Sequence, residues 1–294
     1  MSFSFDLHCH TTASDGIFPP HRLVREAHRK GIVLLSVTDH DTVVGLEEAM
    51  EEGRRLGLKI IPGVEVTAYA DNLEVHILGH FIDPYHPSFL SFLANSQQAR
   101  IDRIKEMIAK LAELGIIVDP EEVLKLGSHG SVGRPHLAQV LVKHGYIGSV
   151  QEAFDVYLGR GALAYVERPY LAAEEVMAKI KAAGGFPTLA HPGIYKRDET
   201  IGMLAAKGLI GLEVYHPDHN PLQIARYARL AEDYGLLATG GSDYHGLAGL
   251  HSPQLGVSFL RERDRRRLWE QVVHLCRLGG MDLDHQEGSR RLNV

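Results

Sequence analysis

The stretch Ile-Val-Leu-Leu-Ser-Val-Thr-Asp-His-Asp, residues 32–41, indicates the class of fold. Its first part suits a buried β-strand, and the polar group Thr-Asp-His-Asp follows at once. In proteins with parallel sheets, functional side chains collect at the carboxyl ends of the strands. Leu23, Val24 and Ala27 recur at helical spacing before the stretch, and a second helical pattern spans residues 44–56 after it. The stretch therefore predicts a strand between two helices of an α/β protein, with functional residues behind the strand.

The alternation of extended and helical patterns continues along most of the chain. Helical patterns near 198–207 and 221–234 lie between short extended runs. Repeated strand and helix units predict a barrel-like or open parallel α/β sheet. The further extended runs occupy residues 59–61, 73–82, 188–190, 208–215 and a segment that ends near 241.

Residues 87–168 do not follow this alternation. Apolar residues recur at three- and four-residue steps over 101–111, and residues 140–158 also have a helical pattern. We interpret residues 87–168 as a mostly helical insertion. The end of the chain, rich in Asp, Arg, Gly and Ser, is typical of a flexible tail. The predicted organisation is a main domain of residues 1–86 and 169–281, the insertion 87–168 and the tail 282–294.

Composition narrows the class of protein. The chain has 294 residues, of which 45% are hydrophobic, so it can bury the core of one large domain with an insertion. Its formal net charge of −6 argues against broad, nonspecific binding of nucleic acid. The 2 cysteines are typical of a reducing compartment. No secretory signal is visible, and no apolar run approaches the roughly 20 residues that cross a bilayer. We expect a cytoplasmic protein that has no membrane partner.

Histidines and carboxylates stand near the ends of the predicted strands. His8 and His10 lie two residues apart in an extended segment, so both imidazoles can reach one ion. Each feature has a simpler explanation by itself: a packed histidine pair, a turn and helix cap at 38–41, or a hydrogen-bonded core residue at His76. As a set, they favour divalent ions such as Mn, Fe, Zn or Mg. The candidate ligands are His8, His10, Asp15, His40, Glu65, His76, His191, Asp243 and His245.

Ordered motifs occur along the chain: Asp6-Leu7-His8-Cys9-His10, Ser14-Asp15-Gly16, Thr38-Asp39-His40-Asp41, Gly63-Val64-Glu65, Ala190-His191-Pro192 and Ser242-Asp243-Tyr244-His245. Together they resemble the PHP (polymerase and histidinol phosphatase) family. That resemblance implies a distorted seven-stranded (β/α)7 barrel, with two or three divalent metal ions at the carboxyl ends of the strands. A further motif in the predicted insertion, Gly133-Arg134-Pro135-His136, makes the chain most similar to the stand-alone nucleotide phosphoesterases of the family.

The resemblance also implies how the ions share their ligands. Glu65 would bridge the first and second ions, and manganese is the ion we expect first. Asp39 and Asp41 are expected to orient ligand imidazoles by accepting their outer N–H groups. The implied sets are His8, His10, Glu65 and Asp243 for the first ion, Glu65, His76 and His191 for the second, and Asp15, His40 and His245 for the third.

The chemistry expected at such ions is hydrolysis of a phosphoester. A metal-bound water can lose its proton near neutral pH, because metal binding lowers its pKa from 15.7 to roughly 7, and the hydroxide attacks phosphorus. Arg134 is the candidate that contacts phosphate oxygens, since its planar guanidinium matches them bidentately. His136, or alternatively His216, could protonate the leaving oxygen or bind a second phosphate. The segment that contains Arg134 and His136 could also be an ordinary loop that precedes a helix, and so could the segment that contains His216.

Three functional hypotheses follow. The first is a metal-dependent phosphoesterase that removes the 3′-phosphate from nucleoside 3′,5′-bisphosphates or hydrolyses short RNA in the 5′→3′ direction. Its partners would be a nucleotide or short oligonucleotide substrate and the phosphate product, and no protein partner is implied. The second is a phosphatase for a small metabolite such as histidinol phosphate. The third is a non-catalytic, metal-bound scaffolding module.

Overall fold

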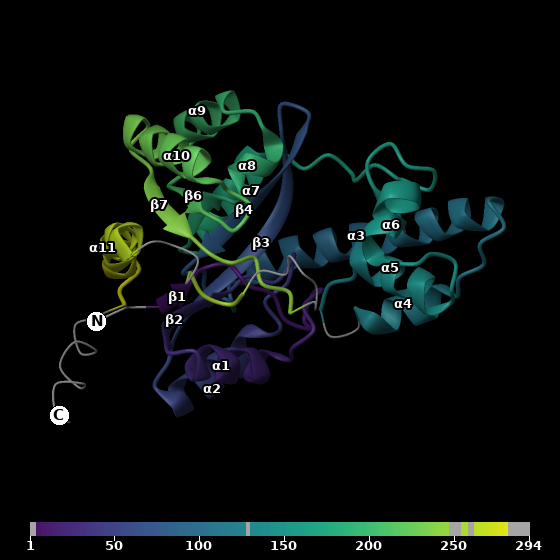
Figure 1. Cartoon of the computed structure of the whole chain (residues 1–294), viewed down its shortest axis with the longest axis horizontal. Helices are drawn as coiled ribbons and strands as arrows, with labels where there is room; N and C mark the ends of the chain where they lie inside the picture. The colour runs from purple at the N-terminus through teal and green to yellow at the C-terminus, as the bar shows by residue number, and fades with distance from the viewer. Residues whose placement is uncertain (1–3, 128–129, 247–253, 258–261, 282–294) are drawn as a thin grey trace.

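One sheet organises the chain (Figure 1). The computed structural model describes residues 4–127, 130–246, 254–257 and 262–281, so the predicted tail at 282–294 lies outside the described residues. Seven strands are hydrogen-bonded in chain order. The predicted α/β class is therefore confirmed. The strands are β1 (Ser4–Asp6), β2 (Ile32–Val37), β3 (Lys59–Ala70), β4 (Leu73–His80), β5 (Phe186–Leu189), β6 (Gly211–Tyr215) and β7 (Leu237–Gly240).

The sheet is mostly parallel. β1, β2 and β3 run parallel to one another, as do β5, β6 and β7, whereas β4 is antiparallel to both of its neighbours. The strand predicted at 59–61 ends too early, because β3 continues to Ala70. Proline and glycine usually weaken or end a strand, so Pro62 and Gly63 predict a strand end in the sequence. Pairing of the residues beyond them with β4 carries β3 through this point.

Among the described residues, the sheet does not close into the expected barrel. No ladder joins β1 to β7 among the residues that the structure describes. The segments that follow these two strands nevertheless meet. Cys9 forms an isolated parallel bridge with Tyr244, and the backbone N–H of Asp243 donates to the carbonyl of His8 at 2.8 Å.

Helices cover the sheet through their apolar faces. Leu23, Val24 and Ala27 of α1 are buried in the same hydrophobic core as residues of α2, α7, α9, α10 and α11. Figure 1 shows α1 and α2 on the opposite side of the sheet from α9 and α10. None of the described helices is long and apolar enough to cross a membrane. These helices are α1 (Pro20–Arg29), α2 (Leu46–Leu56), α7 (Ala173–Ala182), α8 (Pro192–Tyr195), α9 (Glu199–Ala206), α10 (Pro221–Asp233) and α11 (Glu262–Leu278).

The segment between β4 and α7 contains helices with a second hydrophobic core, which includes residues from Ile104 to Ala164. In Figure 1 these helices project from one side of the sheet. The helix predicted over 140–158 is interrupted after Lys143, where Gly145 adopts a φ of +73° that suits glycine. The helices are α3 (Pro87–Glu113), α4 (Pro120–Leu126), α5 (Arg134–Lys143), α6 (Val150–Ala153) and the π-helix η1 (Phe154–Leu158).

Candidate active site

The candidate metal ligands lie together at one end of the sheet. β2 pairs with β3 only as far as Pro62, so Glu65 extends past the end of β2 and forms a bridge with His40. His76 of β4 pairs with Thr67, two residues beyond Glu65. The other candidate ligands follow β1, β5 and β7 at the same end. The strand order therefore explains why side chains from distant parts of the sequence converge.

A first group combines His8, His10, Glu65 and Asp243. The Nε2 atom of His8 lies 3.3 Å from Glu65 Oε2 and 3.3 Å from Asp243 Oδ1. The Nε2 atom of His10 lies 3.2 Å and 3.0 Å from the same two oxygens. One ligand atom from each of the four residues lies within 4.8 Å of the others, a spacing that can hold one metal ion.

Glu65 connects this group to a second one. Its Oε1 atom lies 2.7 Å from His76 Nδ1 and 3.3 Å from His191 Nε2, whereas Oε2 faces the first group. His40 Nδ1 is also 3.1 Å from Oε2, and His40, Glu65 and His76 form a further ligand group. The two oxygens of one carboxylate thus point toward two neighbouring ligand groups.

A third group surrounds Asp15. Its Oδ1 atom lies 3.3 Å from His245 Nε2, and its Oδ2 atom lies 3.8 Å from His40 Nε2. His10 adds a ring nitrogen 4.0 Å from Asp15 Oδ1. The structure therefore brings together the three residues implied for a third ion.

Buried atoms in these groups have no hydrogen-bond partner among the described residues. They are Nε2 of His8 and His10, Nδ1 of His40 and His191, Oδ1 of Asp15 and Oε2 of Glu65. Buried polar atoms without partners are costly to a folded protein. Imidazole nitrogens and carboxylate oxygens are also the atoms that bind Mn, Fe and Zn ions in proteins. The donor set thus fits divalent metal ions.

The carboxylates of the cluster are ionised. Burial by itself raises the pKa of Glu65, but the surrounding imidazoles, that of His40 first, hold this pKa well below its usual range. Burial lowers the pKa of His10, but the carboxylates of Asp243 and Glu65, 3.0 Å and 3.2 Å from its Nε2 atom, outweigh burial and raise this pKa to about 10. Ionised oxygens at the centre of the cluster give it a high affinity for positive charge.

Asp39 and Asp41 behave differently from each other. Asp39 accepts a hydrogen bond from Ser14 Oγ at 2.6 Å, and this hydroxyl lies 3.5 Å from His10 Nδ1. Asp39 therefore reaches a ligand imidazole through a serine. Asp41 Oδ2 instead accepts from Arg100 and Arg168. The prediction that Asp41 orients an imidazole is wrong, because arginines from outside the predicted motifs occupy that oxygen.

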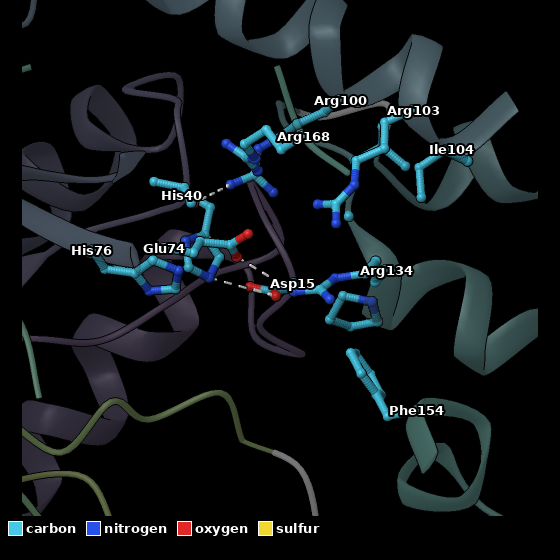
Figure 2. A pocket seen from close by; sticks show the side chains of 14 residues that line it. Asp15, His40, Glu74, His76, Arg100, Arg103, Ile104, Arg134, Phe154 and Arg168 are labelled. Carbon is cyan, nitrogen blue, oxygen red and sulfur yellow. Dashed lines mark hydrogen bonds and ion pairs between the residues drawn. The ribbon is translucent and has the colours of Figure 1, made fainter. Parts of the chain in front are cut away.

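A pocket beside the metal-ligand groups is rich in arginine (Figure 2). Arg134, at the start of α5, lies with its Nη2 atom 3.7 Å from Glu74 Oε1, and its Nη1 atom donates to the carbonyl of Leu158 at 3.4 Å. Its guanidinium carbon is 5.5 Å from the centre of the Phe154 ring. The same pocket is lined by three candidate metal ligands, Asp15, His40 and His76.

Three more arginines line this pocket, and the sequence analysis missed them. Arg100 Nε and Arg168 Nη1 donate to Asp41 at 2.5 Å and 3.2 Å, and Arg103 Nε donates to the carbonyl of Val166 at 2.8 Å. Arg103 Nη2 and Arg168 Nε are buried without a partner among the described residues. The spacing of Arg100 and Arg103 places them on one face of a helix, but it does not identify what that face contacts.

His136 lies outside the residues that line the pocket. Its Nδ1 atom accepts from the backbone N–H of Gly133 at 3.0 Å, and its ring also hydrogen-bonds to the backbone of Ser14. The side chain is buried and caps the start of α5. Of the two candidates in the Gly133–His136 motif, Arg134 faces the pocket and His136 holds the local backbone.

His216 is placed beside the first ligand group. Its Nδ1 atom accepts from the backbone N–H of Asp218 at 3.2 Å. A neutral ring therefore carries its proton on Nε2. This Nε2 atom is buried and lies 3.7 Å from Asp243 Oδ2. The geometry leaves His216 with a proton-bearing nitrogen directed toward the cluster.

Glu213 of β6 is a further residue that the sequence analysis missed. Its oxygens lie 3.1 Å and 3.2 Å from Nδ1 of His8, and Oε2 accepts from the backbone N–H of His191 at 2.8 Å. Burial raises the pKa of Glu213, but the neighbouring His8 imidazole outweighs it and this pKa is about 2. A single glutamate in a strand gives no motif. Its position between two ligand-bearing strands becomes visible only in the sheet.

Comparison with known proteins agrees with this arrangement. A 5'-3' exoribonuclease Rnm from Salmonella typhimurium is 36% identical over 255 residues, which cover 82% of this chain and 85% of that protein. A phosphoribosyl 1,2-cyclic phosphate 1,2-diphosphodiesterase from Eggerthella lenta is 34% identical, with coverage of 83% and 95%. A 3',5'-nucleoside bisphosphate phosphatase from Chromobacterium violaceum is 32% identical, with coverage of 82% and 87%. A solved structure described as a metal-dependent phosphoesterase, from Bifidobacterium adolescentis, superposes with a TM-score of 0.83 at 33% identity over 97% of this chain and 99% of that chain.

The fold, the ligand groups and these relatives define a metal-dependent phosphoester hydrolase. Residues 6–272 match the PHP domain. The chain belongs to the PHP domain family, as the sequence motifs predicted.

Proposed function

We propose that this chain hydrolyses nucleotide phosphoesters: it removes the 3′-phosphate from nucleoside 3′,5′-bisphosphates, hydrolyses short RNA in the 5′→3′ direction, or does both. The observation that carries this proposal is the pocket in which Asp15, His40 and His76 lie alongside four arginines. A substrate with two phosphate groups can place one at the metal ligands and the other at the arginines. The exoribonuclease and the nucleoside bisphosphate phosphatase among the relatives support this class of substrate.

Two or three divalent ions are part of the proposal, with Mn first and Fe, Zn or Mg as alternatives. When bound, such ions supply an activated water and stabilise the negative charge that develops on phosphate oxygens. The protein's own task is to fix the ligands in place before the substrate arrives. The proposed sets are His8, His10, Glu65 and Asp243 for the first ion, Glu65, His76 and His191 for the second, and Asp15, His40 and His245 for the third.

The arginines are proposed to bind the 5′-phosphate, with Arg134 as the anchor. Four arginines line the pocket, whereas Asp41 and Glu74 are the carboxylates that contact them, so about two positive charges remain uncompensated. Burial and then the neighbouring Arg103 lower the pKa of Arg134, which reflects this crowding of positive charge. A terminal phosphate carries nearly two negative charges at neutral pH and offers three acceptor oxygens. It therefore matches both the charge and the free N–H groups of the pocket.

His216 is proposed to protonate the leaving oxygen. Its Nδ1 atom accepts a backbone hydrogen bond, so its Nε2 proton is directed toward Asp243, a proposed ligand of the first ion. His136 is the weaker candidate, because both of its ring nitrogens are hydrogen-bonded to the backbone. Its proposed contribution is to hold the segment that presents Arg134.

The domain organisation is likewise proposed as residues 1–86 and 169–281 for the main domain and 87–168 for the insertion. The separate hydrophobic core of the helices between β4 and α7 supports this division. The main domain is proposed to be a distorted barrel. The bridge between Cys9 and Tyr244 supports contact between its two ends. A cytoplasmic location remains part of the proposal and is compatible with Cys9 and Cys276, which are both free and buried.

A phosphatase for histidinol phosphate or a similar metabolite is the second hypothesis. Such a substrate has one phosphate, so it would leave the arginines without a second anionic group. The scaffolding hypothesis is weaker, because eight of the nine proposed ligands belong to groups that could hold a metal ion, and the ninth, His191, lies 3.3 Å from Glu65 Oε1. Substrate comparison separates the first two hypotheses, and loss of hydrolysis with retained folding after metal removal separates catalysis from scaffolding.

The test compares phosphate release from adenosine 3′,5′-bisphosphate with release from histidinol phosphate and from a phosphoribosyl 1,2-cyclic phosphate. The protein is stripped of metal and resupplied with Mn at a measured ion content. The proposal predicts that the bisphosphate has the highest kcat/KM of the three substrates. A preference for either of the other substrates would move the assignment to that substrate class.

A further inference from the structure

Glu213 contacts two candidate ligands that belong to different ions in the proposed centre. One is the His8 side chain, and the other is the backbone of His191. This carboxylate lies in β6, and none of its surface is exposed. The register of β6 against β7 shifts between Glu213 and Tyr215, so the strand pairing is irregular next to this carboxylate.

The contact with His8 selects which ring nitrogen is free. Both oxygens of Glu213 lie close to Nδ1, at 3.1 Å and 3.2 Å, so Nδ1 carries a proton. The opposite nitrogen, Nε2, faces Glu65 and Asp243 at 3.3 Å from each. A carboxylate behind a ligating imidazole fixes its tautomer and its orientation and increases its basicity. Glu213 is therefore placed to prepare His8 for the first ion.

The contact with His191 acts on the backbone. His191 has a φ of +28° and a ψ of 59°, a conformation that residues other than glycine rarely adopt. Its N–H donates to Glu213 Oε2 at 2.8 Å, which satisfies a buried donor at this strained position. The ring of His191 then reaches Glu65 Oε1 at 3.3 Å, on the side of the second ion. The same carboxylate thus holds a ligand of the second ion.

The other ligand imidazoles have different outer contacts. His245 Nδ1 is 2.8 Å from the carbonyl of Asp243, and His10 Nδ1 is 3.5 Å from a serine hydroxyl. Glu213 does not belong to any of the ligand groups. Among the described residues outside those groups, it is the carboxylate that contacts both the imidazole of one ligand, His8, and the backbone of a second, His191. Its loss would therefore affect more than one ligand.

We propose that Glu213 is a positioning residue that couples the first and second ion sites, so that both sites lose affinity together when its carboxylate is lost. The site formed by Asp15, His40 and His245 has no contact with Glu213 and keeps its affinity. This inference rests on the ion sets of the proposed function. It adds a prediction that those sets alone do not make, namely that one residue outside all three sets controls two of them.

The test is a metal titration that needs no substrate. Metal-stripped wild type, Glu213→Gln and His8→Ala are dialysed against graded free Mn²⁺, and bound Mn is counted by elemental analysis. Loss of an outer-shell partner typically costs about 10- to 100-fold in metal affinity. We expect Glu213→Gln to lower the Mn affinity of two binding steps by this factor. The His8→Ala variant should instead lose mainly one binding step, that of the first ion. The Glu52→Gln variant is the matched control, since Glu52 is a buried carboxylate of α2 that accepts from Arg25 and Arg55 and from none of the candidate ligands.

The possible outcomes separate this inference from the proposed function. Wild-type binding curves in the Glu213→Gln variant, or weakening of a single step, would overturn the coupling and leave the ion sets intact. Failure of the wild type to bind Mn would overturn the ion sets themselves. Glu213→Asp is the second variant in case Glu213→Gln does not fold. It keeps the charge on a shorter side chain, and we expect a smaller loss that still affects both sites.

Discussion

Arg100 and Asp41 form a buried ion pair in which Arg100 Nε donates to Asp41 Oδ2 at 2.5 Å. Asp41 directly follows His40, a candidate metal ligand, and Arg100 belongs to α3. The pair therefore fixes the helices after β4 against the loop that carries part of the cluster. The arginine pocket and the metal ligands are held in one geometry by this contact.

Asp41→Ala is expected to be strongly destabilising. Removal of this carboxylate leaves Arg100 and Arg168 without their shared acceptor in a buried place, and such a change typically costs about 3–5 kcal/mol. The free energy of unfolding, measured by urea titration, checks this. Lys143→Ala, which breaks an exposed ion pair with Glu122, is the control and should cost about 1 kcal/mol or less. Equal effects of the two substitutions would contradict a structural role for the buried pair.

Arg134→Ala is expected to raise KM for adenosine 3′,5′-bisphosphate by about 10- to 100-fold, because a charge-assisted contact to the 5′-phosphate is lost. The same substitution should leave kcat/KM for adenosine 3′-monophosphate nearly unchanged, since that substrate has no 5′-phosphate. Arg229, which is exposed on α10, provides the control in Arg229→Ala. A similar loss with both substrates would assign Arg134 to folding or to the reacting phosphate instead.

His216→Gln is expected to lower kcat about 100-fold on nucleotide substrates and to change KM little, because general acid catalysis contributes roughly 10²–10⁴-fold. The loss should be much smaller with p-nitrophenyl phosphate, whose leaving group departs without a proton. Steady-state kinetics on both substrates measure the difference. His144→Gln, at an exposed position, is the control. An equal loss on the two substrates would exclude proton donation to the leaving group.

His80 is expected to make stability depend on pH. Burial lowers its pKa to about 4, whereas an unfolded histidine has a pKa of about 6.5. Between these values the unfolded chain binds a proton that the folded protein does not. The free energy of unfolding therefore keeps its full value above about pH 6.5 and decreases as pH falls toward 4. At pH 5 this contribution amounts to a loss of about 2 kcal/mol.

Urea unfolding of wild type and His80→Asn at pH 7 and pH 5 isolates this contribution, because the other buried histidines are common to both proteins. The variant should lose less stability between the two pH values than the wild type does. His28→Asn, at an exposed position of α1, should behave like the wild type. The same pH dependence in all three proteins would show that His80 is not held neutral by burial.

Much of the fold and the convergence of the ligands could be predicted from the sequence. The motifs at His8, His40 and His191 follow strands, and parallel strands bring their carboxyl ends to one edge. The position of Glu65 also depends on the continuation of β3 past Pro62, which local propensity does not favour. That continuation comes from pairing with β4, a nonlocal interaction.

The supporting residues could not be predicted. Arg100, Arg168 and Glu213 are ordinary charged residues in a helix, a loop and a strand, with no motif around them. Arg100 and Arg168 contact Asp41 across 59 and 127 positions of sequence, and Glu213 contacts His8 across 205 positions. Residue spacing carries no information about such pairs without the sheet order.

The central claim is that these ligand groups support metal-dependent hydrolysis of a nucleotide with two phosphates. The most direct measurement is phosphate release from adenosine 3′,5′-bisphosphate by metal-stripped protein as Mn is restored, with bound Mn counted in parallel and with His8→Ala alongside. The account predicts no release without metal, release that rises with bound Mn, and loss of release in His8→Ala. Folded protein with measured bound Mn and no release from this substrate would contradict it.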